Sequence, residues 1–385
     1  MMVGKIPEQV ISEIIKRTDL VAVASRVAGL KFRERRRGDF WACCPFHAEK
    51  TPSFHIEQRK GTYHCFGCSA GGSAFQFLMS IDNISFKEAA IELAALAGIE
   101  IEGETSKPRR KPQPMVVDQK AVVASEAASA EAARRKAFDK WWRPRKPFAG
   151  SLAETYLVNV RGIAGDVARS FKNLGYLDDA PFYAQLSRGR FDVVNRGPAM
   201  VAGLQYADGR FAGVHVTFLK ADGSGKLELH DPMNAGKKLP AKKVQGRPWG
   251  SAIRLTDTAP RMVAGEGIET TAAVIDATGY AGWVAYSLGN LVGAANGKGA
   301  RHPENGRTRL PSTTPDMGRH GFLPPKQCEH LTLLGDGDTK DVWMLRALLK
   351  RGCLRFQMLG VKTDYSMSDS GRDFNDYLMK EQAHG

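Results

Sequence analysis

Two short pairs of potential metal ligands constrain the N-terminal part of the chain more than any other feature. Two residues separate Cys44 from His47, two residues separate Cys65 from Cys68, and residues 48–64 lie between the pairs. A two-residue spacer lets one tight turn direct both side chains at one ion, and two such turns complete a tetrahedron. Three thiolates and one imidazole suit Zn²⁺ and leave no open coordination position. We therefore predict one structural zinc, which supplies much of the folding free energy of its small module.

Neighbouring residues leave the choice of ligands open. Cys43, His55 and His64 lie close to the two pairs, and Cys43 would need three intervening residues to reach His47. The Cys44 pairing therefore has the better spacing, and unpaired cysteines in an ordinary core are the alternative. The segments between the pairs have the pattern of two short strands of a zinc ribbon, Ser53–Glu57 and Thr62–His64.

Composition points to a globular protein with a polyanionic partner. The 385 residues are 43% hydrophobic and 25% charged, and 55 Lys and Arg outnumber 41 Asp and Glu, which gives a net charge of +14. Nucleic acid and an anionic membrane are the partner classes that such a charge favours. No apolar window is long enough to span a bilayer, and the first twenty residues lack a signal-peptide core. We expect a cytoplasmic protein with reduced thiols, in which Cys328 and Cys353 are buried apolar groups.

Changes in composition divide the chain into four parts. A zinc-ribbon domain precedes a Pro-rich basic stretch that resembles a flexible linker. An Ala-rich helical segment and a basic α+β segment follow, and the last part alternates strands with helices. The predicted fold class is therefore multidomain, α+β and α/β. The expected boundaries are 1–101, 102–118, 119–257 and 258–385.

The last part has the pattern of βαβ units with a mainly parallel sheet. Strands alternate with amphipathic helices, and two of the strands end in Gly-Glu-Gly and Gly-Asp-Gly-Asp. Segment 296–328 is rich in Gly, Pro and Arg, and structureless loops of this length are often functional or mobile. The expected elements are strands at 261–265, 283–287, 330–334 and 354–359, and helices at 268–279 and 340–352.

Acidic residues follow the predicted strands of this last part. In an open parallel sheet, ligands bind outside the carboxyl ends of the strands, so acids from separate strands should meet at one edge. Converging carboxylates suit Mg²⁺ or Mn²⁺. The alternative is that the acids belong to surface turns and to a helix N-terminus. The candidates for this metal site are Glu266, Asp336, Asp338, Asp373 and Asp376.

Two basic clusters are candidates for contact with nucleic acid or nucleotides. The first precedes the zinc ligands and alternates with aromatic residues that could stack on bases. The second lies in the middle of the chain, where a solvated surface charge is the favoured interpretation of each lysine taken singly. The candidates are Arg33, Arg35, Arg36 and Arg37 in the first cluster and Lys237, Lys238, Lys242, Lys243 and Arg247 in the second.

The segment CPFHAEKTPSFHIEQRKGTYHCFGCSAGGSAFQFLM (44–79) resembles the zinc-binding domain of bacterial DnaG-type primases. The resemblance extends over nearly all of residues 5–100. It implies zinc binding at the positions of Cys44, His47, Cys65 and Cys68. It also implies that the ribbon surface reads a single-stranded template.

Residues 258–380 resemble the toprim domain that primases share with topoisomerases. An acid after the first strand and Asp-x-Asp after a later strand carry this resemblance. It implies that Glu266 acts as a metal ligand or acid/base and that Asp336 and Asp338 bind the metal. Asp373 and Asp376 match a later acidic motif more loosely. The variety most similar is the toprim of short primase-like proteins from phages and mobile elements.

The sequence therefore predicts a DNA primase that makes short RNA primers on single-stranded DNA by metal-dependent nucleotidyl transfer. Its expected partners are template DNA and nucleoside triphosphates, with no membrane. No helicase-binding domain follows the toprim segment and no Walker A motif occurs, so a replicative helicase would have to be supplied separately. A toprim nuclease and a non-catalytic single-strand-binding protein of a mobile element are the alternatives.

Overall fold

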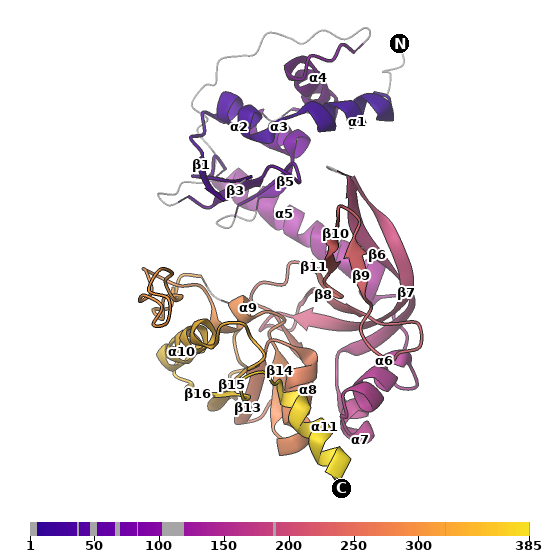
Figure 1. Cartoon of the computed structure of the whole chain (residues 1–385), viewed down its shortest axis with the longest axis vertical. Coiled ribbons are helices and arrows are strands. Elements are labelled where there is room, and N and C mark those ends of the chain that lie inside the picture. Colours follow the sequence, from indigo (N-terminus) through magenta and orange to yellow (C-terminus); the bar gives the residue numbers. More distant parts are fainter. Residues whose placement is uncertain are drawn as a thin grey trace. The chain divides into compact units, whose positions relative to one another are not determined.

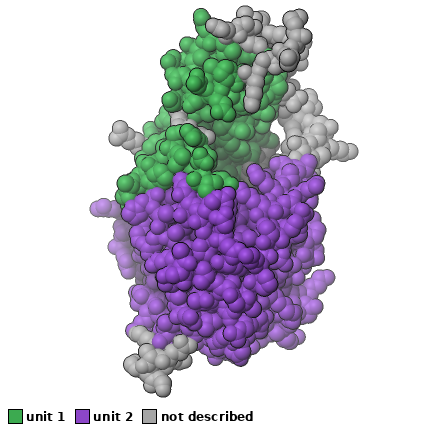
Figure 2. Space-filling view, turned by 90° about the vertical axis from the view of Figure 1, so that its right-hand side faces the viewer, with its two compact units in different colours: residues 1–116, 183–193, 231–236 green, residues 117–182, 194–230, 237–385 purple. Residues whose placement is uncertain are grey.

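A computed structural model describes most of the chain (Figure 1). The chain forms two compact units, which Figure 2 shows in different colours. The first comprises 1–116, 183–193 and 231–236, and the second 117–182, 194–230 and 237–385. Four of the predicted features, the linker 102–118 and the residues Arg37, His47 and Cys68, lie outside the described residues. The described ranges are 6–36, 38–46, 52–65, 70–82, 84–101, 119–187, 190–319 and 321–384.

The N-terminal part consists of a small antiparallel sheet and four helices. Local signals set the helix ends: Asp19 accepts hydrogen bonds from the first turn of α2, Gly29 ends that helix at φ 65°, and Ser85 and Glu88 form a capping box on α4. The helices are α1 (Glu8–Arg17), α2 (Leu20–Ala28), α3 (Ala74–Asp82) and α4 (Phe86–Leu96). The strands are β1 (Arg33–Arg36), β2 (Asp39–Ala42), β3 (Phe54–Glu57), β4 (Thr62–Cys65) and β5 (Gly71–Ser73).

The five strands pair in sequence order and confirm the predicted zinc-ribbon sheet. Because side chains alternate across a strand, Phe54 and Ile56 of β3 are buried, while Tyr63 and Cys65 of β4 face the same interior. Phe54 lies opposite Cys65 in the register, so one cysteine of the second pair is built into the core wall. Strand pairing thus determines which side of the sheet Cys65 faces.

A nine-stranded mixed sheet organises the rest of the chain. Its order is β11-β8-β7-β12-β14-β13-β15-β16, with β6 paired to β7. The helical elements are α5 (Gln119–Ala137), η1 (Phe138–Trp142), α6 (Leu152–Thr155), η2 (Tyr156–Val160), α7 (Gly165–Ser170), α8 (Ile268–Thr278), α9 (Leu288–Val292), α10 (Val342–Met358) and α11 (Phe374–His384). The strands are β6 (Leu174–Ser187), β7 (Arg190–Gln205), β8 (Phe211–Phe218), β9 (Leu229–Asp231), β10 (Asn234–Leu239), β11 (Lys242–Gly246), β12 (Ala252–Arg254), β13 (Arg261–Gly265), β14 (Ala281–Val284), β15 (His330–Gly335) and β16 (Lys362–Met367).

The four C-terminal strands β14, β13, β15 and β16 are mutually parallel, as the βαβ pattern predicts. Alternate residues of β13 serve two different cores: Val263 packs in the cluster that contains α8, whereas Met262 and Ala264 pack in the cluster that contains α10. The sheet is therefore covered on both faces. From β13 the chain crosses to β14 on one side, and from β15 it crosses to β16 on the other. The gap between the ends of β13 and β15 is thus a topological switch point.

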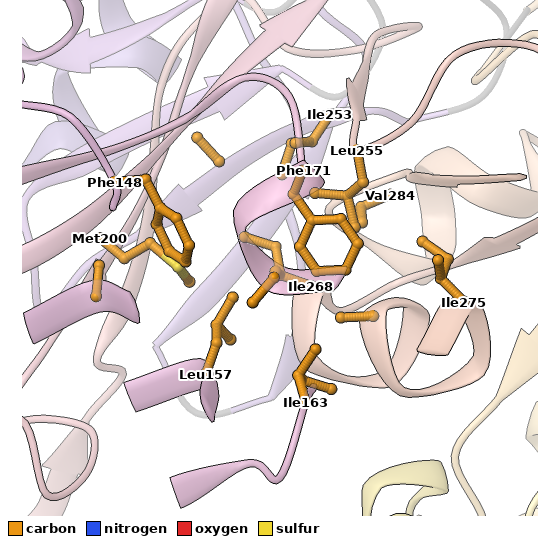
Figure 3. Packing of buried hydrophobic residues seen from close by; sticks show 14 of the residues in the cluster. Phe148, Leu157, Ile163, Phe171, Met200, Ile253, Leu255, Ile268, Ile275 and Val284 are labelled. Carbon is orange, nitrogen blue, oxygen red and sulfur yellow. The ribbon is translucent and has the colours of Figure 1, made fainter. Parts of the chain in front are cut away.

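The sheet and its core run across the predicted boundary at 257/258. Strand β12, which precedes that boundary, pairs with β14, which follows it. Figure 3 shows the same continuity in the apolar core, where Phe148 and Phe171 of the middle segment pack in one cluster with Ile268 and Val284. The middle and last parts of the chain therefore share one hydrophobic core.

The structure contradicts the strand expected at 354–359. Helix α10 continues through this segment to Met358, and the strand follows at Lys362–Met367. Gly352 lies within the helix and does not end it. A Cβ at this position would come within 2.6 Å of Leu333 Cδ1, which explains why the residue is a glycine. The glycine permits close packing of α10 on β15, and the buried Phe356 extends the apolar stripe of the helix beyond it.

Segment 296–328 contains no helix or strand among its described residues, yet backbone hydrogen bonds order much of it. The amides of Asn296 and Leu310 donate to the carbonyls of Thr314 and Ala300, and isolated bridges join Ala295 to Pro315. The segment therefore has hairpin-like order. No helix within the described residues is both long and apolar enough to cross a bilayer.

Candidate active site and metal centre

The two predicted zinc ligands that the structure describes are buried in the ribbon core. Cys44 follows β2 and is 7% exposed, and Cys65 ends β4 and is fully buried. The backbone amide of Phe46 lies 3.4 Å from Cys44 Sγ, two residues along, as a ligand turn requires. The hydroxyl of Ser53 lies 3.1 Å from Cys65 Sγ. Such hydrogen bonds to sulfur stabilise thiolate ligands and orient them.

The surroundings favour Cys44 over the alternatives left open by the sequence. Cys43 is exposed, because it lies on the opposite side of the strand end. His55 packs its ring on Trp41 at 4.6 Å and lies 3.3 Å from an Asp39 carboxylate oxygen, so its ring is engaged on the outer face of the sheet. His64 is exposed. The arrangement supports Cys44 as the first ligand of the site.

The basic strip before the zinc ligands lies on β1. Arg33 is exposed there, whereas the side chains of Arg35 and Arg36 and the whole of Arg37 lie outside the described residues. Of the nearby aromatics, Phe54 and Tyr63 are buried in the core, stacked at 5.0 Å, and cannot receive a base. Trp41 is only half-buried and remains the aromatic best placed for stacking.

Acids from three loop regions line one cavity of about 360 Å³ in the second unit. Glu266 follows β13, Asp336 and Asp338 follow β15, and Asp373 precedes α11. The first two strand ends flank the switch point, so the parallel sheet itself brings these carboxylates together. The convergence expected from the sequence is therefore present for four of the five candidate acids.

Asp336 is the most perturbed of these acids. Its Oδ2 accepts a hydrogen bond of 2.8 Å from the hydroxyl of Thr270, whereas its buried Oδ1 has no hydrogen-bond partner within the described residues. Burial and the negative charges of Asp373, Asp338 and Glu266 raise the pKa of Asp336 to about 6, against the lowering effect of Thr270. The site thus holds an excess of negative charge at neutral pH.

Asp376 does not line the cavity. Its Oδ2 accepts from the backbone amide of Asp373, and Asp373 Oδ1 accepts from the amide of Asp376. This reciprocal pair caps α11, which accounts for both residues' position at the helix start. Asp373 caps the helix and also lines the cavity. Asp376 caps the helix but is not among the residues that line the cavity.

The middle basic cluster is also divided by the structure. Lys242 and Lys243 lie on β11 and line the cavity. Lys237 and Lys238 are exposed on β10 away from it, and Lys238 pairs with Glu228 at 2.6 Å. Arg247 is not among the cavity residues either. Only part of the predicted basic cluster therefore faces the acids.

Sequence reasoning did not single out Glu269, which proves to be the most buried acid at the site. Its carboxylate lies 2.9 Å from Lys226 Nζ and 2.8 Å from Lys242 Nζ, and it accepts a 3.0 Å hydrogen bond from Tyr156. Burial alone would raise the pKa of Glu269, but the charges and hydrogen bonds of Lys242 and Lys226 hold it well below its usual range. The one feature of the sequence that could have indicated Glu269 is its position three residues after Glu266.

This network extends to a third cation. Arg161 Nε donates to the hydroxyl of Tyr156 at 3.0 Å, and the backbone carbonyl of Arg161 accepts from the side chain of Asn375 on α11. Arg161 and both lysines line the same cavity as the acids. These three cations therefore form a cationic wall of the cavity, and Glu269 pairs with both of its lysines.

The donor set fits a hard divalent cation. Carboxylate oxygens line the cavity, and the buried Oδ1 of Asp336 accepts no hydrogen bond from any residue that the structure describes. No three His, Cys, Asp or Glu side chains in the described part of the chain form a ready cage. Magnesium in proteins is usually held by one or two carboxylates together with water and substrate phosphates, which this cavity can accommodate.

We expect Asp336→Asn to stabilise the metal-free protein above pH 6. The carboxyl has a pKa of about 6 when folded and about 3.8 in a model peptide, so its ionisation opposes folding. The gain should be about 1–3 kcal/mol at pH 7.5 and should vanish below about pH 3, where the carboxyl is protonated in both the folded and the unfolded state. Calorimetry at several pH values checks this. Asp364→Asn is the control, because the pKa of Asp364 is lowered and its loss should destabilise instead.

We expect Glu269→Gln to destabilise the second unit by about 2–4 kcal/mol. The substitution leaves the ammonium groups of Lys226 and Lys242 without their shared carboxylate, and their partial exposure moderates the cost. Denaturant unfolding of the full chain measures the change. Adding Lys226→Met should recover part of the loss, and a double variant as unstable as the single one would contradict this account.

Comparison with known proteins agrees with the zinc site. Residues 6–109 match the CHC2 zinc finger family, and residues 132–255 match a domain of unknown function, DUF7146. The CHC2 match implies a bound zinc. A crystal structure of the Aquifex aeolicus primase, containing its zinc-binding and RNA polymerase domains, aligns with 97% of this chain and 84% of its own, at 18% identity and a TM-score of 0.35.

Curated relatives extend the likeness beyond the zinc finger. The DNA primase of Haemophilus influenzae is 50% identical over 100 residues, which are 26% of this chain and 16% of that protein. The DNA primase of Pseudomonas putida is 38% identical over 177 residues, which are 46% of this chain and 24% of that protein. The second alignment is longer than the zinc-finger match, and both span less than a quarter of the relative. The chain is therefore similar to bacterial DNA primases over part of its length, and its residues 6–109 match their CHC2 zinc finger.

Proposed function

We propose that the chain is a primase that synthesises short RNA primers on single-stranded DNA by metal-dependent nucleotidyl transfer. The observation on which this rests is the single cavity in which Glu266, Asp336, Asp338 and Asp373 face Arg161, Lys226 and Lys242. Carboxylates on one wall suit divalent cations, and ammonium and guanidinium groups on the other suit a triphosphate. The kinship with DNA primases supports the same activity.

Asp336 and Asp338, with Glu266 or Asp373, would hold Mg²⁺ or Mn²⁺. Bound by these carboxylates, such a cation would supply Lewis-acid stabilisation of the negative charge on the hydroxyl and phosphoryl oxygens. Thr270 orients Asp336 by occupying Oδ2, which leaves Oδ1 for the cation. Lys226, Lys242 and Arg161 would bind the phosphates and neutralise charge as pyrophosphate leaves.

His215, which lines the same cavity, is suited to a neutral role. Burial and the charge of Lys242 lower its pKa to about 4, so the ring carries no charge at neutral pH. It can therefore contact a nucleotide without adding to the cationic wall. Its buried Nδ1 has no hydrogen-bond partner within the described residues, which leaves it available to a bound group.

The zinc ribbon would present the template. Arg33 is exposed on β1, and Trp41 on the neighbouring strand is half-buried beside it in the β1–β2 register. A cation for phosphates beside an aromatic ring for bases is the arrangement that single strands bind. We further propose that the C-terminal part is a toprim domain of the variety found in phages and mobile elements, and that any replicative helicase is supplied separately.

Product analysis tests this function. The full chain is incubated with single-stranded DNA, labelled ribonucleoside triphosphates and Mg²⁺. New oligoribonucleotides that require both template and metal support the proposal. Shortened DNA strands without new oligomers would identify a nuclease instead, and DNA binding without either product would identify a non-catalytic binding protein.

A further inference from the structure

Segment 294–316, which we call the Arg hairpin, is an ordered projection between α9 and β15. The amide of Asp316 donates to the carbonyl of Ala294, and the amide of His302 donates to the carbonyl of Thr308. The side chain of Asn305 accepts from the amides of Arg307 and Thr308 and closes the tip. Backbone pairing of this kind holds a surface in one shape.

The Arg hairpin is anchored beside the predicted metal acids. His302 is 5% exposed, and its ring lies 3.2 Å from the carboxylate of Asp341, three residues after Asp338. The buried Arg351 donates to the carbonyl of Ser312 at 3.0 Å, and Trp343 donates to Glu304 at 2.8 Å. These contacts attach the hairpin to α10, the helix that follows the loop containing Asp336 and Asp338.

Its outer surface is cationic and contains no ion pairs among the described residues. Lys298, Arg301, Arg307 and Arg309 are all exposed. The two acids of the hairpin are engaged elsewhere, since Glu304 accepts from Trp343 and Asp316 accepts from the amide of Gly318. The positive charge of the hairpin is therefore not neutralised by its own carboxylates.

The backbone bridge places Arg301 directly opposite Arg309. Like charges at opposed positions of an antiparallel pair destabilise it. Arg309 donates to the carbonyl of Gly299 at 2.7 Å, which occupies only one of its five donors. The repulsion between the two guanidinium groups decreases when phosphates bind between them and accept hydrogen bonds from both. The hairpin is therefore suited to a polyanion.

The kind of polyanion follows from what the hairpin lacks. Residues 294–316 include no Phe, Tyr or Trp, so the hairpin itself has no ring to stack on an unpaired base, and the neighbouring ring of Trp343 is held by Glu304. Cations alone contact the sugar–phosphate backbone, where a duplex offers more closely spaced charge than a single strand. We propose that the Arg hairpin binds the phosphate backbone of the template–primer duplex, independently of sequence, as it leaves the cavity.

This inference rests on the proposed primase function for the origin of the duplex, but its test does not require synthesis. The variant R301Q/R307Q/R309Q is compared with wild-type full chain for binding to an RNA–DNA hybrid of about 16 base pairs, without nucleotides. We expect affinity to fall by about tenfold or more, and the slope of log affinity against log salt to fall by about 2–3. Binding of single-stranded DNA of equal length should change less than about twofold.

The matched control is K220Q/K350Q/K362Q, which removes three exposed cations that lie outside the hairpin and do not line the cavity. It should bind the hybrid as wild type does, and both variants should keep the wild-type melting temperature. Equal hybrid affinities and salt slopes for the two variants would overturn the inference, as would an equal loss for single-stranded DNA. If wild type binds the hybrid through the hairpin but makes no primers, the proposed function alone fails.

Discussion

Asp338→Ala is expected to reduce template-dependent incorporation of nucleotides by at least about a thousandfold. The residue lines the cavity beside Asp336, and a cation held there would contribute several kcal/mol of stabilisation to charge that develops in the transition state. Because Asp338 is exposed and follows β15 rather than lying in its core, the substitution should leave the fold intact. Gel analysis of labelled products at a fixed Mg²⁺ concentration measures the loss.

The matched control is Asp369→Ala, which removes an exposed acid from the loop after β16 that does not line the cavity. This variant should synthesise primers at nearly the wild-type rate. Both variants should bind single-stranded DNA as wild type does, since the ribbon is unchanged. Wild-type incorporation by Asp338→Ala would exclude this cavity as the site of metal-dependent chemistry.

Cys65→Ser is expected to abolish stoichiometric zinc binding and to unfold the N-terminal unit. Structural zinc contributes roughly 10–16 kcal/mol of apparent binding free energy to small modules, which exceeds what a ribbon core of this size supplies alone. The serine hydroxyl cannot replace a thiolate at the fully buried end of β4. Elemental analysis of the purified chain and limited proteolysis of residues 1–101 measure the two effects.

Cys43→Ser is the control for the zinc ligand. Cys43 is exposed beside the buried Cys44, so its replacement should retain one zinc and leave proteolysis unchanged. The second unit contains its own apolar clusters and should resist digestion in both variants. Loss of zinc from Cys43→Ser with retention in Cys44→Ser would reverse the ligand choice made from spacing and burial.

Local sequence patterns predict those features that depend on neighbouring residues. The spacing of the two ligand pairs predicts tight turns that direct both side chains at one ion. The ribbon strands β3 and β4 alternate more buried and less buried residues, as period-two patterns require. The acids at the ends of β13 and β15 could be assigned to one edge because a parallel sheet aligns its carboxyl ends. Cys328 and Cys353 were expected to be buried and are, with the pKa of each raised to about 11 by burial.

Features that depend on distant partners could not be read in this way. Gly352 has the pattern of a helix stop, but contact with β15 across the fold makes it a packing glycine within α10. Glu269 has the pattern of an ordinary acid in a first helical turn. Its role arises from two ion pairs, one with Lys242 on β11 and one with Lys226 in the segment between β8 and β9. No local pattern indicates which cation will lie against which acid.

The amino-acid sequence by itself determined the zinc module, the parallel strands and the acids that follow them, because each of these is encoded within a few neighbouring residues. The tertiary structure alone decided that the middle and last parts share one sheet, that Asp376 caps a helix while Asp373 reaches the cavity, and that a buried glutamate supports the cationic wall. The physical reason is that burial and charge pairing depend on residues far apart along the chain, and only the folded chain brings them together.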